Sequence, residues 1–171
     1  MKISFITTGL FALVGTSLAA PSSHLTKRID QQDVINSISA WINDVNNVNS
    51  FLNSAHGLSG DDLKTAAETT LGFAQDEPTQ LEILGSVVDP GNLDVQTLQI
   101  VFGQVLTGLQ NIIDNSGDAG IVSSNVQFIN EVRCINVLHS AEGLWAAAAA
   151  AVGAPPPPQA NREDACANIQ S

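Results

Sequence analysis

The sequence is poor in the side chains on which acid–base catalysis and nucleic-acid binding depend. Its 171 residues include no tyrosine, three histidines and six lysines or arginines, against 17 aspartates and glutamates. Three of the six basic residues fall within the first 28 positions, so the rest of the chain carries a formal charge of 3 − 17 = −14. Phosphate backbones and anionic lipids both require a lysine- and arginine-rich surface, and we therefore expect neither a nucleic-acid partner nor electrostatic membrane docking.

The usual motifs of enzymes and metal proteins are also missing. The loop that starts at Asp114 fails as an EF-hand, because position 6 is Ala119 where the calcium loop needs glycine. His139 and Ser140 lie next to each other, but no Gly-x-Ser-x-Gly elbow is present. We expect no enzyme activity, no metal and no cofactor. The acidic pairs are interpreted as solvated helix ends; they are Asp61-Asp62, Asp76-Glu77 and Glu163-Asp164.

The only long apolar run lies at the start of the chain. Residues 1–19 have the basic start, apolar centre and small final residues of a signal peptide. Lys27 and Arg28 form a dibasic pair that predicts a second cut, with residues 20–28 as a pro-peptide; the alternative is two solvated charges. No Asn-x-Ser/Thr triplet and no apolar C-terminal tail follow, so we expect neither N-glycosylation nor a lipid anchor. The prediction is a eukaryotic secreted, extracellular protein without a transmembrane segment in the mature chain, with the cell wall as an alternative location.

Apolar residues recur every three or four positions in four stretches, which is the period of amphipathic helices. The stretches are 30–54, 59–88, 95–112 and 121–152, with Asp30 and Ser59 as predicted N-caps. Pro78 either kinks the second helix or opens a new one, and the unbroken phase of the apolar stripe favours a kink. On the fourth helix the predicted buried face consists of Phe128, Val132, Ile135, Leu138, Ala141, Trp145 and Ala148. No stretch alternates with period two. We expect an all-α, four-helix up-down bundle over residues 29–154.

The last 17 residues, 155–171, form a proline-rich tail that begins with four consecutive prolines. The chain has two cysteines, Cys134 and Cys166, and an even pair in a secreted chain predicts one disulfide. A tail at polyproline rise is long enough to run back along the fourth helix and bring the two cysteines together. Closing this loop contributes about 3–4 kcal/mol in the chain-entropy model. We therefore interpret the pair as a structural staple.

Aromatic side chains on the helices are the candidate lining of an apolar ligand site, since bundles often hold ligands between facing helices. The alternative is that these side chains simply fill the core. The candidates are Trp41, Phe51, Phe73, Phe102, Phe128 and Trp145.

Several segments resemble fungal small secreted proteins of uncharacterised function. They are DVINSISAWINDVNNVNSFLNSA, FAQDEPTQL and INEVRCINVLHSAEGLWAAAA, together with the Lys-Arg pair. More remotely, the leader and first helix resemble the hydrophobic surface binding protein A and cell-wall mannoprotein group. That resemblance implies a helical, non-catalytic protein that adsorbs on hydrophobic surfaces or encloses fatty-acyl ligands. The resulting hypothesis is a secreted protein that binds an apolar small molecule, such as a lipid, or a hydrophobic surface. The alternative is a secreted effector or cell-wall interaction protein that acts on a host or wall protein.

Overall fold

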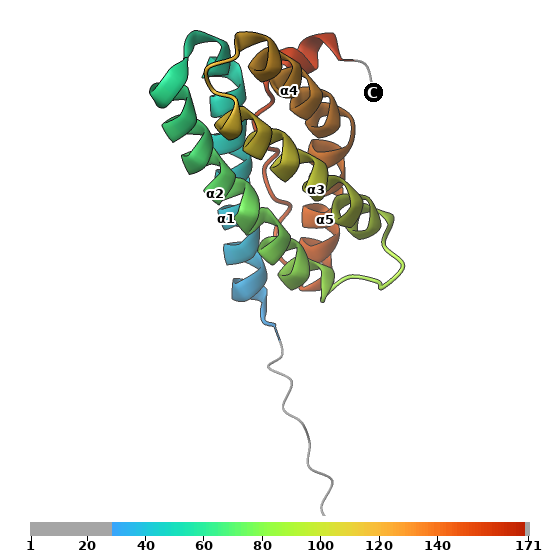
Figure 1. The fold of residues 1–171 in the computed structure, drawn as a ribbon. Coiled ribbons are helices and arrows are strands. Elements are labelled where there is room, and N and C mark those ends of the chain that lie inside the picture. The colour runs from blue at the N-terminus through green and yellow to red at the C-terminus, as the bar shows by residue number, and fades with distance from the viewer. Residues whose placement is uncertain (1–28, 170–171) are drawn as a thin grey trace, which may run out of the picture.

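The computed structural model describes residues 29–169, and this part of the chain contains helices and no strand. Four rods make up the structure (Figure 1). Three are the single helices α1 (Gln31–Ser54), α2 (Gly60–Gly85) and α3 (Leu93–Asp114); the fourth joins α4 (Ala119–Val132), a π-helical turn (Arg133–Val137) and α5 (Leu138–Ala151). Short 3₁₀ turns cover Ala55–Gly57 and Asp164–Asn168. The all-α prediction is confirmed. The predicted signal peptide, pro-peptide and dibasic site lie outside the described residues.

Side-chain caps begin three of the helices. The Asp30 carboxylate accepts a hydrogen bond of 2.8 Å from the Asp33 backbone N–H in a capping box, as predicted. Asn92 and Asp118 cap α3 and α4 in the same way. Ser59 occupies the N-cap position of α2, as predicted, but its side chain makes no capping hydrogen bond. Gly60 follows it with φ +57°, a conformation that glycine adopts without a steric penalty.

α2 continues through Pro78 as one helix of 26 residues. The apolar positions on both sides of the proline keep the same phase, and Leu63, Ala67, Leu81 and Leu84 are all buried. Because burial of this stripe holds the helix together, the missing N–H of Pro78 does not end it. The prediction of one long helix rather than two is confirmed.

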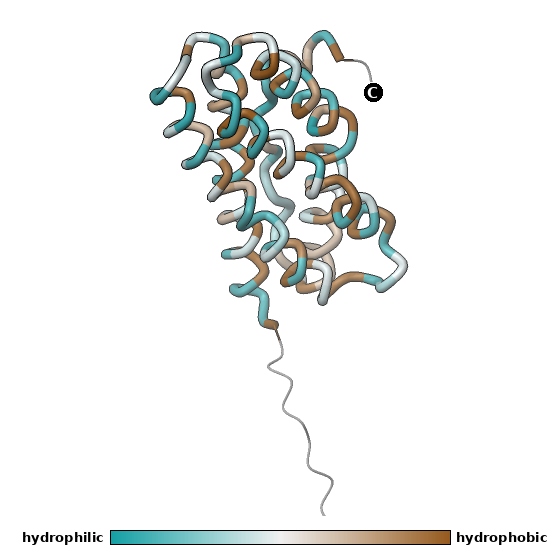
Figure 2. The backbone as a smooth tube through the Cα atoms, in the orientation of Figure 1, coloured by the Kyte–Doolittle hydropathy of each residue, from teal (hydrophilic) through white to brown (hydrophobic). Residues whose placement is uncertain are grey.

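The rods pack as neighbours around a single core: α1 lies against α2, α2 against α3, and α3 against the fourth rod, which returns to α1 (Figure 1). Hydrophobic and hydrophilic residues recur along every helix (Figure 2), and the hydrophobic ones form the contacts between rods. At the centre Trp41 lies 5.9 Å from Phe102 and 5.8 Å from Trp145, measured between ring centroids. Such tilted and edge-to-face pairs add to the energy of apolar burial.

Two glycines of α3 differ in their surroundings. A Cβ at Gly108 would lie 2.6 Å from Ile129, so the absence of a side chain allows α4 to approach α3 closely. A Cβ at Gly103 would meet no heavy atom within 4 Å.

The predicted buried face of the fourth rod is confirmed on α5, where Leu138, Ala141, Trp145 and Ala148 are buried, but it is wrong at two positions before α5. Phe128 and Ile135 are 41% and 43% exposed, although Val132 is buried as expected. The core row is instead Val122, Val126, Ile129, Arg133 and Val137. This row has the same helical spacing as the predicted one, but it places a charged residue on the seam, where sequence patterning expects an apolar residue.

In the described part of the chain, no helix combines the length and the apolar character that crossing a membrane would take.

Candidate functional site

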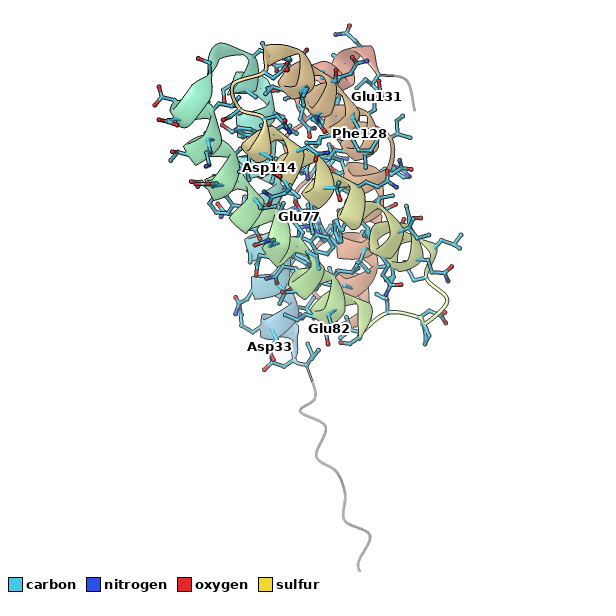
Figure 3. The ribbon with its side chains drawn as sticks, viewed as in Figure 1. Asp33, Glu77, Glu82, Asp114, Phe128 and Glu131 are labelled. Carbon is cyan, nitrogen blue, oxygen red and sulfur yellow. A yellow bond between two sulfur atoms is a disulfide. The ribbon has the colours of Figure 1, made fainter. Side chains whose placement is uncertain are left out.

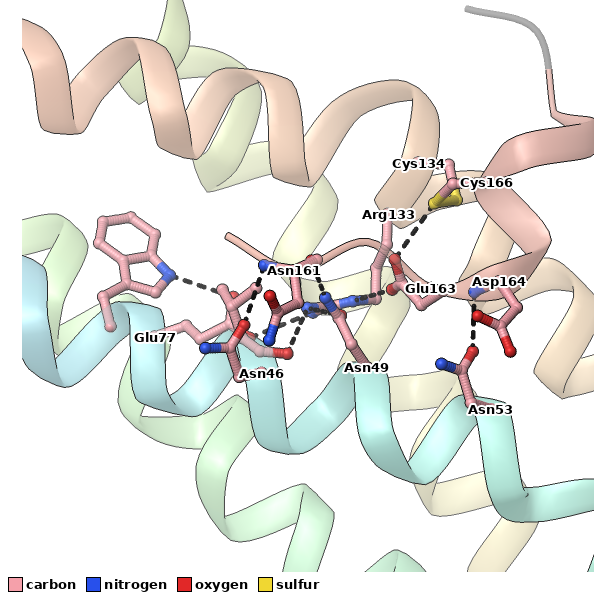
Figure 4. Close-up of polar contacts among 12 residues, drawn as sticks. Asn46, Asn49, Asn53, Glu77, Arg133, Cys134, Asn161, Glu163, Asp164 and Cys166 are labelled. Atoms are coloured by element: carbon pink, nitrogen blue, oxygen red, sulfur yellow. Dashed lines mark hydrogen bonds and ion pairs between the residues drawn. A yellow bond between two sulfur atoms is a disulfide. The ribbon is translucent and has the colours of Figure 1, made fainter. Parts of the chain in front are cut away.

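A buried arginine connects the fourth rod to α1, α2 and the tail (Figure 4). Arg133 lies in the π-helical turn and is fully buried. Its Nε donates to Glu163 in the tail at 2.8 Å, and its Nη1 donates to Glu77 on α2 at 3.1 Å. Nη2 donates to the Asn49 side chain at 2.8 Å and to the Val45 carbonyl at 3.4 Å, both on α1. One side chain thereby bonds to α1, α2 and the tail.

The charged groups of this cluster shift one another's pKa values. Burial lowers the pKa of Arg133, but the two carboxylates of Glu77 and Glu163 outweigh this effect and raise it. Burial raises the pKa of Glu77, while Arg133 and the Trp41 indole N–H, 3.3 Å from Glu77, act in the opposite direction. The guanidinium therefore remains charged, and its main role is structural: removing it would leave two carboxylates in the interior.

Two of these groups are buried, contrary to the prediction. Glu77 and Glu163 were interpreted as solvated, whereas each is 1% exposed and both converge on Arg133. The other members of their pairs, Asp76 and Asp164, are less buried. The available signal was Arg133 itself, a lone basic residue in phase with the apolar row of its helix, which predicts a buried counter-charge.

A row of asparagines on α1 binds the backbone of the tail (Figure 4). Asn46 accepts from the Asn161 N–H at 3.0 Å, Asn49 donates to the Asn161 carbonyl at 2.5 Å, and Asn53 accepts from the Asp164 N–H at 2.9 Å. The spacing of three and four residues places these amides on one face of α1. They supply the hydrogen bonds that a neighbouring strand would otherwise give to the extended tail.

The predicted disulfide is present. Cys134 and Cys166 are bonded, with their Cα atoms 5.3 Å apart. Glu163 lies close to both sulfur atoms. These three groups resemble a metal-ligand set in type, but disulfide sulfurs are not thiolates and do not bind a cation in that way.

The His139–Ser140 segment does not form a nucleophilic arrangement. Ser140 is buried, and the neighbouring Glu142 is occupied by the tail: it accepts from the Ala160 N–H at 3.2 Å and from Arg162 at 2.6 Å. Glu142 therefore holds the tail on α5 rather than orienting a base.

The six aromatic residues predicted to line a ligand site are not brought together around one cavity. Trp41, Phe102 and Trp145 pack on one another in the core, and Phe51 is buried in α1. Phe73 is half-buried and borders a surface hollow with Phe51. Phe128 is exposed on α4. Most of this set therefore fills the core, as the alternative interpretation held.

An apolar groove lies elsewhere, between α1, the end of α5 and the four prolines. Its volume is about 380 Å³. Isoleucines of α1 form one wall, and residues 155–158 form the other. Ser39 is the one polar residue of the lining, and its hydroxyl donates to the Ile35 carbonyl of its own helix at 2.8 Å. The full lining is Ile35, Ile38, Ser39, Ile42, Ala149, Ala154, Pro155, Pro156, Pro157 and Pro158.

A second unusual carboxyl group lies between α1 and α2. Asp44 is 6% exposed, and its Oδ2 atom has no hydrogen-bond partner in the described structure. Burial, and then the neighbouring Asp76, raise the pKa of Asp44 to about 7. Asp76 is itself an acceptor, since Gln80 donates to it at 2.6 Å. Asp44 therefore loses its proton in the neutral range.

Comparisons with known proteins add no relative: no family model, curated protein or solved structure matches the chain.

Proposed function

We propose that the protein is a non-catalytic carrier that binds an uncharged apolar small molecule, such as a lipid chain, in the groove between α1 and the four prolines. The observation that carries this proposal is the lining, which is made of isoleucine, alanine and proline and contains no charged residue. A volume of about 380 Å³ lies within the range of small-molecule sites.

The anchoring of the tail supports a preformed groove. The prolines restrict the backbone of one wall, and Asn46, Asn49 and the disulfide hold the following residues on the helices. A wall that is already ordered loses little conformational entropy when a ligand binds. In this proposal the helices follow an up-down order, and the disulfide staples the tail back against them.

The proposal includes an extracellular location, in keeping with the predicted leader. A disulfide that holds the structure together persists in an oxidising compartment. The resemblance to small secreted proteins belongs to the same proposal.

Titration with Nile red, a neutral apolar dye, tests the site. We expect saturable binding that weakens at least fivefold in Ile42→Gln, because the new amide would be buried against the bound dye. Leu71→Gln is the matched control: Leu71 is also a half-buried apolar residue, but it lies on α2 and not in the groove. No binding by the wild type, or equal losses in the two variants, would contradict the proposal.

A further inference from the structure

The large apolar side chains that the described chain leaves exposed all lie on α3 and the fourth rod. Two are on α3, two on α4 and one in the π-helical turn. Their exposed fractions are Leu93 75%, Ile100 72%, Ile121 40%, Phe128 41% and Ile135 43%. Single exposed apolar residues are ordinary, but a set confined to two neighbouring helices marks an interaction surface.

The five side chains lie on one face, here called the α3–α4 face. Leu93 and Ile100 are seven residues apart, as are Ile121, Phe128 and Ile135, so each set forms a row along its helix. Asn111 has the helical phase of Leu93, and it donates to Asn125 on α4 at 3.4 Å. Because this bond joins α3 to α4, the apolar row of α3 and the apolar row of α4 border the same side of the contact between these two helices. Phe128 projects from α4, and Asp114 marks the end of α3 (Figure 3).

The α3–α4 face carries few charges. No Asp, Glu, Lys or Arg occurs over residues 95–113 or 119–130, although the described chain carries 17 acidic and three basic residues. Glu131 is exposed between Phe128 and Ile135, and the other exposed polar residues are mostly amides and hydroxyls, including Gln104, Thr107 and Gln110. α1 and α2 carry eight of the acidic residues, and half of these are exposed.

We propose that the α3–α4 face binds a second copy of this chain. Two molecules of charge −14 repel each other in most orientations, and the repulsion is smallest where the fewest charges face each other. A symmetric dimer needs a surface that is complementary to itself. Uncharged apolar rows meet this need, and so do amides such as Asn111, because each amide both donates and accepts hydrogen bonds.

The spacing and the size of the face both fit this occupant. Apolar residues seven apart are the pattern by which helices of separate chains pair along their length. A strip as long as α3, roughly 33 Å, and two helices wide, roughly 20 Å, offers about 650 Å² per copy. The total of about 1,300 Å² lies at the lower end of the range for specific protein interfaces. This dimer is independent of the groove, which lies on α1, α5 and the tail.

Sedimentation equilibrium of the full chain, produced through a secretion pathway, tests the proposal. We expect a monomer–dimer equilibrium in the micromolar range that tightens as salt is raised from 10 mM to 500 mM, because salt screens the repulsion between the two acidic molecules. The double variant Ile100→Glu and Phe128→Glu should raise the dissociation constant at least a hundredfold. Its matched control adds the same charge at two exposed positions of α2, through Gln75→Glu and Thr79→Glu, and should still form dimers.

Circular dichroism keeps the test independent of folding, since the substituted side chains are exposed and helicity should be unchanged in both variants. A wild type that remains monomeric at 100 µM in 500 mM salt would overturn the proposal. So would dimers of equal strength in the Ile100→Glu, Phe128→Glu variant. Adsorption of a monomer to neutral phosphatidylcholine vesicles, abolished by the same variant, would assign the face to a lipid surface and equally overturn the second copy.

Discussion

Replacing Asp44 by asparagine should stabilise the protein at pH 8 and have little effect at pH 4. The pKa of Asp44 is about 7 in the folded protein and 3.8 as the ordinary value. Between these values the folded state holds a proton that the unfolded state has released, so the free energy of unfolding falls as pH rises from about 4 to about 7. Above pH 7 the full cost of the buried charge is present. Asparagine does not ionise and does not carry this cost.

The magnitude follows from the pKa difference. About three pKa units at 1.36 kcal/mol each set an upper limit of about 4 kcal/mol. Asp44 keeps a small solvent-exposed fraction, which screens its charge, and we therefore expect about 2 kcal/mol at pH 8.

Urea unfolding followed by tryptophan fluorescence at pH 4, 6 and 8 measures this difference, because Trp41 and Trp145 are both fully buried. The relevant quantity is the free energy of unfolding of Asp44→Asn minus that of the wild type. The pH effects of the other carboxyl groups are common to both proteins and cancel in this difference. Glu68→Gln, an exposed substitution on α2, is the control and should show no such pH dependence. A difference that stays constant from pH 4 to pH 8 would refute the reasoning.

Four further changes can be measured by the same unfolding experiment. Arg133→Met should cost about 3–5 kcal/mol, because it leaves Glu77 and Glu163 without their buried counter-charge; a loss below 1 kcal/mol would contradict this. Gly108→Ala should cost about 1–3 kcal/mol through the contact with Ile129, whereas Gly103→Ala, where the space is open, should gain about 0.5–1 kcal/mol from helix propensity. Replacing Cys134 and Cys166 by serine opens a loop of 32 residues and should cost about 3–4 kcal/mol. Two free thiols in the wild-type protein by mass spectrometry would contradict the last prediction.

Helical periodicity predicted α1, α2 and α3 well because each has a continuous apolar stripe. The α3 row from Leu98 to Ile112 and the continuity of α2 through Pro78 are both as expected. The disulfide followed from the number of cysteines and the reach of the tail. These features depend on local pattern and chain length, which the sequence contains directly.

The burial of the charged residues could not be predicted from helical periodicity. Glu77 and Glu163 are adjacent in sequence to more exposed acids, and only the packing of α2, the fourth rod and the tail separates the buried members from the others. In the structure Asn46, Asn49 and Asn53 bind a segment more than 100 residues away. Contacts between residues so far apart in the chain leave no periodic pattern in the sequence from which they could be predicted.

The Arg133 cluster also has a consequence for the order in which the chain assembles. Its ligands come from α1, α2 and Glu163, and Glu163 is near the end of the chain. During synthesis the four rods can pack together before residue 163 has been added to the chain. At that stage Arg133 can bind Glu77 but still lacks its second carboxylate, Glu163. The tail then supplies its acceptor, its backbone bonds to the asparagines and its cysteine at almost the same time. The arrival of the last residues, rather than the collapse of the helices, therefore completes the fold.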